Sequence, residues 1–225
     1  MTPHPALSRQ PRELVQLAGE WRGGVPDGGT WVEEKLDGVR ACYVAGRLLT
    51  REGVEIGGVG HILHRIGGME RAAGVSLFID GEFMVAGDYL RTLSHIGHGA
   101  GAREQGTFHL FDCLTEAEWR ANDCDRPLYQ RKAMLAGLVE AEAAGPVSWE
   151  WREGTHGREP EEAALSLVPD IWCATQADVE AEAARIWARG GEGVMVKDAE
   201  APYRRLRTNA WMKYKRNGWA TRKVA

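Results

Sequence analysis

The sequence of 225 residues lacks any long uninterrupted hydrophobic run. A helix that crosses a membrane needs about 20 consecutive, mostly apolar residues, and residues 1–12 contain no apolar segment of the signal-peptide kind. The four cysteines show no C-x-x-C spacing, which argues against a zinc ribbon and against a disulfide framework. We therefore expect a cytoplasmic protein with reduced thiols and no membrane association.

Acidic residues are absent from residues 203–225, although they outnumber basic residues in the chain as a whole. This segment carries eight basic residues, and its charge of +8 stands against −12 on residues 1–202, a division that the net charge of −4 hides. Such an asymmetry indicates a polyanionic partner. Trp211 and Tyr214 lie within the basic segment and favour a packed structure there over a solvated tail.

Short segments of strand character, separated by turns, dominate the chain. We predict strands at 31–35, 40–44, 48–51, 76–85, 107–114, 147–151, 171–174, 193–197 and 210–215. Helices are predicted at 128–144 and 177–189, and a short one at about 11–21. Together these elements predict an α+β fold in which antiparallel sheets are flanked by helices.

The most informative motif is the hexapeptide K-L-D-G-V-R, which begins at Lys35 and ends at Arg40. On its own, a lysine beside an Asp-Gly turn is typical of a surface hairpin. Further motifs follow along the chain: Asp80-Gly81-Glu82, Phe111-Asp112, E-G-V-M-V-K from Glu192 to Lys197, and W-M-K-Y-K from Trp211 to Lys215. Two segments accompany them, Thr50-Arg51-Glu52-Gly53 and Arg126-Pro127-Leu128, the latter leading into a helix with Arg131.

This ordered series resembles the motifs of nucleotidyltransferases that form a covalent lysyl-nucleotide, namely ATP-dependent DNA ligases, RNA ligases and mRNA-capping guanylyltransferases. It covers residues 31–216, and the Thr-Arg-x-Gly turn and the W-x-K-x-K form of the last motif favour the DNA ligases. The resemblance implies an ATP-grasp-like nucleotidyltransferase domain of antiparallel sheets flanked by helices. It also implies an ATP-dependent DNA ligase that uses ATP and Mg²⁺ and acts on nicked duplex DNA.

The resemblance further assigns roles to individual residues. Lys35 would attack the α-phosphate of ATP and form lysyl-AMP, the AMP would pass to a 5′-phosphate, and a 3′-hydroxyl would then seal the nick. The residues expected to bind ATP or AMP are Glu33, Arg40, Arg51, Glu82, Phe111, Lys197, Lys213 and Lys215. Those expected to hold Mg²⁺ are Glu82 and Glu192, and those expected to bind DNA are Arg204, Arg205, Arg207 and Arg216.

Elementary chemistry supports several of these roles. The two-residue period of a strand places Trp211, Lys213 and Lys215 on one face, where two ammonium groups can neutralise charge on a polyphosphate. Carboxylate oxygens such as those of Glu82 are ligands that Mg²⁺ accepts. Phe111 offers an aromatic surface on which a purine can stack, although aromatic residues in apolar strands also build cores.

The expected organisation is an N-terminal extension with a short helix at 1–30, an adenylation domain at 31–216 and a tail at 217–225. In DNA ligases of this kind an OB-fold domain, a barrel that binds nucleic acid, follows the last motif. We expect no OB-fold domain within this chain, which makes an OB-fold or DNA-binding partner in trans a candidate. We expect the chain itself to be a monomer.

Two alternatives to a DNA ligase remain open. One is an RNA ligase or capping-type guanylyltransferase, and the other is a non-catalytic remnant that binds nucleotide or DNA. Degenerate copies usually lose the nucleophile or a carboxylate, whereas Lys35, Glu82 and Glu192 are all present. A zinc site is not predicted, because the pairs His61/His64 and His95/His98 have no acidic or cysteine partner at ligand spacing.

Overall fold

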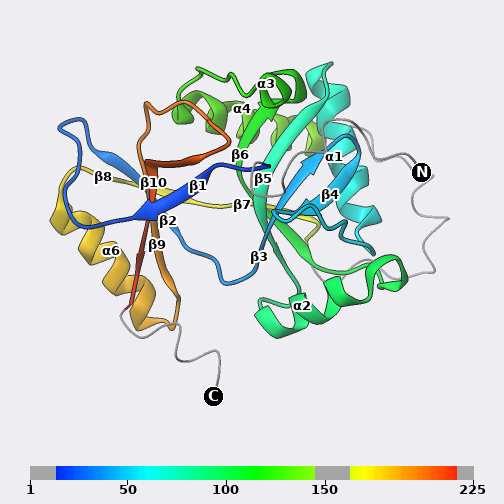
Figure 1. Ribbon diagram of the computed structural model, residues 1–225, viewed down its shortest axis with the longest axis horizontal. Helices are drawn as coiled ribbons and strands as arrows, with labels where there is room; N and C mark the ends of the chain where they lie inside the picture. Colours follow the sequence, from blue (N-terminus) through cyan, green and yellow to red (C-terminus); the bar gives the residue numbers. More distant parts are fainter. Residues whose placement is uncertain (1–13, 145–162, 217–225) are drawn as a thin grey trace.

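The computed structural model describes residues 14–144 and 163–216, which form two five-stranded sheets that lie side by side (Figure 1). The strand predicted at 147–151 and the tail predicted at 217–225 lie outside the described residues. Within the described ranges, no helix is long and apolar enough to cross a membrane. The α+β prediction is confirmed.

The first sheet, called sheet A, has the strand order β1-β10-β9-β2-β8. Its strands are β1 (Leu17–Glu20), β2 (Thr30–Glu34), β8 (Asp170–Cys173), β9 (Gly193–Lys197) and β10 (Arg207–Lys215). All neighbours in it are antiparallel except β1, which runs parallel to β10. Helix α6 (Gln176–Ala188) covers its outer face, where Ile186 of the helix belongs to one buried cluster with Val194 and Val196 of β9.

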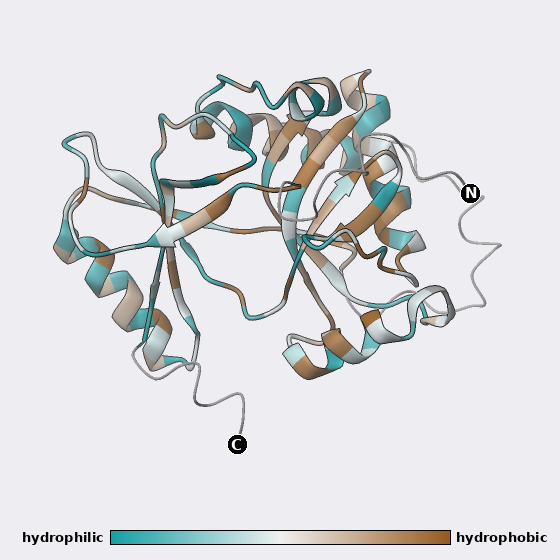
Figure 2. Cartoon of the chain, viewed as in Figure 1, coloured by the Kyte–Doolittle hydropathy of each residue, from teal (hydrophilic) through white to brown (hydrophobic). Residues whose placement is uncertain are grey.

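The second sheet, called sheet B, has the strand order β4-β3-β5-β6-β7. Its strands are β3 (Val39–Val44), β4 (Arg47–Thr50), β5 (Leu77–Met84), β6 (Thr107–Thr115) and β7 (Leu165–Leu167). The helical elements around it are α1 (Gly60–Ala73), α2 (Tyr89–Gly97), the short 3₁₀ helix η3 (Gly99–Gly101), α3 (Glu116–Ala121) and α4 (Leu128–Ala144). Figure 2 shows hydrophobic residues concentrated along β5 and β6, consistent with their almost complete burial.

Sheet B buries both of its faces. On the outer face Ile79 and Leu110 pack with Ile62 of α1 and Leu135 of α4. On the inner face the core is largely aromatic and combines residues of both sheets with residues of α3 and of the loop before β10: Phe78, Phe111, Trp119, Tyr203 and Trp211. The alternation of side chains along each strand separates these two cores, and the aromatic one joins the sheets beside the site described below.

The helix predicted at about 11–21 is wrong for the described part of that range, since Leu17–Glu20 is strand β1. The edge of β10 offers unpaired backbone groups, and pairing with them outweighs the local helical pattern. Gly19 permits the contact, because a Cβ there would lie 2.9 Å from the side-chain oxygen of Asn209. Leu14 and Val15 are buried in the aromatic core, so residues 14–20 are part of the packed fold.

Candidate active site

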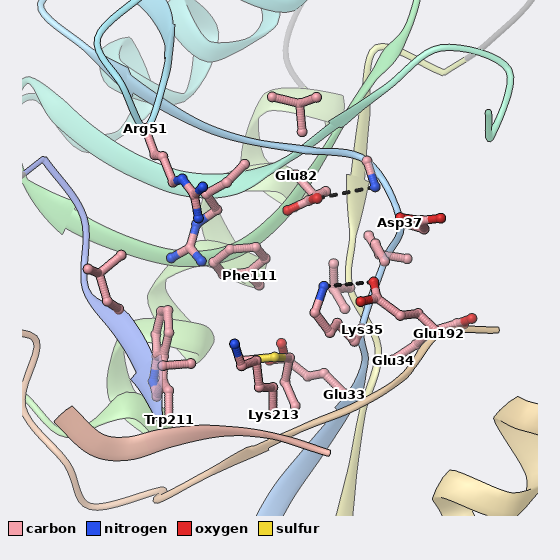
Figure 3. A pocket seen from close by; sticks show the side chains of 18 of the residues that line it. Glu33, Glu34, Lys35, Asp37, Arg51, Glu82, Phe111, Glu192, Trp211 and Lys213 are labelled. Atoms are coloured by element: carbon pink, nitrogen blue, oxygen red, sulfur yellow. Dashed lines mark hydrogen bonds and ion pairs between the residues drawn. The ribbon is translucent and has the colours of Figure 1, made fainter. Parts of the chain in front are cut away.

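A pocket of about 490 Å³ opens between the two sheets (Figure 3). Sheet A and the loops at its strand ends supply most of its cations, and sheet B supplies Arg40, Glu82 and Phe111. The predicted site residues that line it are Glu33, Lys35, Arg40, Arg51, Glu82, Phe111, Glu192, Lys197, Arg207, Lys213 and Lys215. Residues of five separate motifs therefore meet in one cavity.

Lys35 lies directly after β2, with its backbone N–H donating to the carbonyl of Gly193 at 2.8 Å. Its Nζ lies 2.7 Å from Oε2 of Glu192, and Nζ of Lys215 lies 2.5 Å from Oε1 of the same carboxylate. Glu192 is only 3% exposed, whereas Lys35 is 22% exposed. Burial raises the pKa of Glu192, but Lys35 and Lys215 outweigh it and hold the pKa below its ordinary value. The carboxylate therefore stays ionised between two ammonium groups.

Two glycines of the motifs are required by close approach of the backbone. A Cβ at Gly38 would lie 2.6 Å from the carbonyl oxygen of Phe83, and the Gly38 N–H donates to Oε1 of Glu82 at 3.2 Å. Gly193 has φ of 151°, and a Cβ there would lie 2.1 Å from the carbonyl oxygen of Tyr214. Gly38 thus lets the chain after Lys35 approach β5, and Gly193 lets the chain after Glu192 approach β10.

Glu82 projects from β5 into the same pocket as Lys35 (Figure 3). Burial raises its pKa to about 7, although Lys35 and Arg40 oppose the shift, and the charge of Glu192 adds to it. Two carboxylates that feel each other's charge beside an open cavity suit a hard cation such as Mg²⁺, which binds oxygen and keeps several waters. Glu82 and Glu192 thus fit the expected metal role.

Phe111, Glu33 and Lys197 line the pocket and are almost completely buried. Nζ of Lys197 lies 2.6 Å from Oε2 of Glu33 and 4.4 Å from the centre of the Phe111 ring. The other oxygen of Glu33 lies 2.6 Å from Nζ of Lys132, on helix α4. Burial raises the pKa of Glu33, but these two lysines outweigh it and lower the pKa overall. Burial lowers the pKa of Lys197, which Glu33 only partly offsets.

Arg40, which was expected to bind nucleotide, lines the pocket with its guanidinium engaged by a buried carboxylate. Its Nε and Nη2 each lie 2.7 Å from the carboxylate of Asp80, which is completely buried, and its Cζ lies 4.6 Å from the centre of the Phe111 ring. The hydroxyl of Tyr203 donates to Asp80 at 2.6 Å. Arg40 therefore lines the pocket but also holds Phe111 in place, a dual position that the linear motif does not reveal.

The four arginines expected to bind DNA lie in different surroundings. Arg207 lines the pocket, and its side chain donates to the carbonyl of Ala18. Arg204 pairs with Asp125, while the guanidinium of Arg205 lies 4.9 Å from the ring of Trp119. Arg216 follows the last residue of β10. The structure thus brings Arg207 to the candidate active site and packs Arg204 and Arg205 against the region of α3.

Two other sequence features resolve differently. In the first His-x-x-His pair, His61 Nε2 lies 2.9 Å from the carbonyl of Gly106, and in the second, His95 Nε2 lies 2.8 Å from that of Gly57. Residues 14–144 and 163–216 contain no cluster of three His, Cys, Asp or Glu side chains suited to a metal.

The sequence did not predict Lys132 as a site residue. The only signal for it is its position directly after Arg131, in the segment that follows Arg126-Pro127-Leu128.

Comparison with known proteins identifies the family of this chain. The family described as ATP dependent DNA ligase domain matches residues 24–215. The chain belongs to this family. No curated protein matches its sequence.

Solved ligase structures share the fold. The bacteriophage T7 ATP-dependent DNA ligase in complex with ATP is 16% identical with a TM-score of 0.68, covering 91% of this chain and 69% of that one. The Chlorella virus DNA ligase-adenylate is 16% identical with a TM-score of 0.65, covering 89% and 66%. The chain named Pmar-Lig_Pre is 20% identical with a TM-score of 0.72, and this chain spans 90% of its own length but 46% of that protein. These likenesses show a shared nucleotidyltransferase fold.

Proposed function

We propose that this ligase-family chain is an adenylation domain that forms lysyl-AMP on Lys35 and seals nicks in duplex DNA. The observation that carries the proposal is the position of Lys35 Nζ, 2.7 Å from Glu192 in a pocket that is also lined by Phe111 and by three further lysines. A nucleophilic lysine needs a proton acceptor and cations that match the charge of its phosphate substrate. The family match to ATP-dependent ligases supports ATP as that substrate.

In the first step, the lone pair of Lys35 Nζ attacks the α-phosphorus of ATP. A nitrogen–phosphorus bond forms, the bond from the α-phosphorus to the oxygen bridging the α- and β-phosphates breaks, and pyrophosphate leaves. Glu192 Oε2, at 2.7 Å, is within reach of the proton that Nζ must lose. Lys213 and Lys215 line the same cavity and neutralise charge on the phosphates.

Glu82 and Glu192 would hold Mg²⁺, which supplies neutralisation of charge on the phosphate oxygens. Phe111 would stack on the purine and Glu33 would meet its edge. Both line the same pocket as Lys35 and Glu192 (Figure 3).

In the later steps, AMP passes to the 5′-phosphate at a nick, and the 3′-hydroxyl displaces AMP to close the strand. Arg51, Arg207 and Lys213 line the pocket and supply positive charge toward a DNA backbone. The ligase crystal structure with ATP and the ligase-adenylate support both the cosubstrate and the covalent intermediate as properties to be tested here.

Incubation with ATP or GTP labelled at the α-phosphate tests the first step. We expect ATP and Mg²⁺ to give a labelled protein band that survives alkali and is released by acid or by acidic hydroxylamine, as a phosphoramidate bond requires, and we expect Lys35→Ala and Lys35→Arg to abolish it. Labelling by GTP alone would indicate a guanylyltransferase, and no labelling would contradict the proposal.

Sealing assays on nicked DNA/DNA, RNA/DNA and RNA/RNA duplexes test the polynucleotide. We expect sealing on DNA/DNA to exceed that on RNA/RNA. The reverse preference would make the chain an RNA ligase, and labelling without any sealing would restrict the proposal to adenylation.

A further inference from the structure

Helix α4 carries two successive cations that reach different sheets. Arg131 is completely buried and forms a two-point ion pair with Asp112 of β6, at 2.8 and 2.9 Å. Lys132 reaches sheet A, where its Nζ lies 2.6 Å from Glu33 of β2 and 2.7 Å from Asp170 of β8. Successive residues on a helix point about 100° apart, so adjacent side chains can reach separate partners. One helix therefore connects both walls of the pocket.

The partners of this helix adjoin the two groups proposed to meet the base. Asp112 directly follows Phe111, the proposed stacking surface. Glu33 is itself the proposed contact for the edge of the base, and it is 2% exposed. Its oxygens are held separately, one by Lys132 and one by Lys197, each at 2.6 Å. This arrangement fixes both the rotation of the carboxylate and its depth in the wall.

The orientation of Glu33 has a consequence for base recognition. An ionised carboxylate accepts hydrogen bonds and cannot donate them. Adenine presents an amino group at position 6, which donates, whereas guanine presents a carbonyl there, which accepts. A Glu33 carboxylate that is held ionised and faces position 6 of the base therefore favours adenine, because guanine offers an acceptor at position 6 and its donors only at positions 1 and 2.

We propose that Lys132 is a positioning residue that sets the purine specificity of this site, by orienting Glu33 toward the edge of the base. Asp170 contributes by holding Lys132 from the other side, and it is only 24% exposed. Arg131 anchors the adjoining part of β6 through Asp112, the residue after Phe111. The inference rests on the proposed nucleotide site, but it concerns selectivity rather than the reaction itself.

The test compares ATP and GTP in single-turnover labelling of the whole chain, with the half-saturating concentration and the maximal rate measured separately. For Lys132→Met we expect the preference for ATP over GTP to fall about tenfold, the loss of one charge-assisted hydrogen bond. The fall should come from a higher half-saturating concentration for ATP, with the maximal rate changed less than about threefold. Lys132→Arg should restore most of the preference.

Arg65→Met is the matched control, because it removes an ion pair of α4 with α1 that is remote from the pocket lining. It should leave the preference unchanged. An unaltered preference in folded Lys132→Met would overturn the inference. If that variant is unfolded at the assay temperature, Asp170→Asn decides, since it removes only the rear partner of Lys132. A smaller fall in the same ratio is then expected, and no fall would overturn the inference.

Equilibrium dialysis with labelled ATP and GTP separates this inference from the proposed reaction. If the wild-type chain binds ATP in preference to GTP but forms no covalent label, the proposed reaction fails and Lys132 can still be tested by binding. If it forms the label but accepts ATP and GTP equally, the reaction stands and the specificity inference fails.

Discussion

Two sets of ion pairs lie within the same molecule but differ in their access to water. In the closed set, Arg131 and Asp112 are both 0% exposed and Arg40 holds a fully buried Asp80. In the open set, Glu192 is shared by Lys35 and Lys215, which are 22% and 37% exposed. The closed pairs use the planar, two-point geometry of arginine, whereas the open pairs use the point charge of lysine.

This difference in access to water separates the charged residues that hold the fold together from those that can contact a substrate. A closed pair cannot exchange partners without exposing an unpaired charge to a low-dielectric interior. The lysines around Glu192 can turn to an incoming polyphosphate, because water already reaches them. The closed set therefore fixes the walls of the pocket and the open set meets the substrate.

The largest loss of stability should follow from breaking a closed pair. Asp112→Ala leaves Arg131 buried without its partner, and we expect the free energy of unfolding to fall by about 3–5 kcal/mol. Urea denaturation followed by tryptophan fluorescence measures it. The double variant Asp112→Leu with Arg131→Met should recover most of the lost stability. If Asp112→Ala were as stable as the wild type, the closed pairs would not stabilise the fold more than the open ones.

The next effect has the opposite sign and depends on pH. Glu82 has a pKa of about 7 in the fold against an ordinary value of 4.5, so the folded state favours its protonated form. Its ionisation costs stability progressively as pH rises from 4.5, and the full cost, about 3 kcal/mol, is present above pH 7. Glu82→Gln should therefore stabilise the chain at pH 8, with a gain that shrinks toward pH 5.

Thermal unfolding of Glu82→Gln and wild type across that pH range provides the measurement. The same variant should lose lysyl-AMP formation, because it removes a proposed metal ligand. Equal melting temperatures of the two proteins at pH 8 would show that burial does not raise the pKa of Glu82.

Breaking the open set should cost little stability and much activity. Glu192→Gln leaves Lys35 and Lys215 near each other, but solvent screens them, so we expect a stability change within about 1 kcal/mol. The rate of lysyl-AMP formation should fall by at least about 100-fold through loss of the proton acceptor. Rapid-quench labelling beside urea denaturation checks both, and a stability loss as large as that of Asp112→Ala would contradict the comparison.

The smallest effect is expected at the rim of the pocket. Lys213 pairs with Glu20, which is 59% exposed, so Glu20→Gln should leave stability unchanged within about 0.5 kcal/mol. Releasing Lys213 should lower the half-saturating concentration of ATP by about twofold. Labelling rates at varied ATP concentration measure this. A higher half-saturating concentration in the variant would show that Glu20 positions Lys213 for ATP instead.

Much of the sheet structure and of the pocket lining could be predicted from sequence. Each motif is a strand or a strand end, so alternation alone places Lys213 and Lys215 on one face of β10, with Tyr214 on the other. Fold closure then brings Lys35 and Glu192 together, although they are far apart in the chain. The motifs predict the pocket lining because each of them contributes at least one residue to it.

Other features required the three-dimensional structure. Strand β1 forms because β10 presents an open edge, which no local pattern reports. Helix α1 was missed because it begins at Gly60 and contains Gly67 and Gly68, residues of low helical propensity. The role of Lys132 depends on how α4 lies across both sheets. Lys132 could not be assigned from sequence because its partners, Glu33 and Asp170, lie on sheet A and it belongs to none of the motifs.

The most direct test of the central claim is to locate AMP on the chain. The wild-type protein would be incubated with ATP and Mg²⁺, digested with trypsin and analysed by mass spectrometry, with Lys35→Arg as the control. We expect the mass of AMP on Lys35 alone, in a peptide left uncleaved at that lysine, and no adduct in the control. AMP on Lys197, Lys213 or Lys215, or an adduct that persists in Lys35→Arg, would contradict the assignment of the nucleophile.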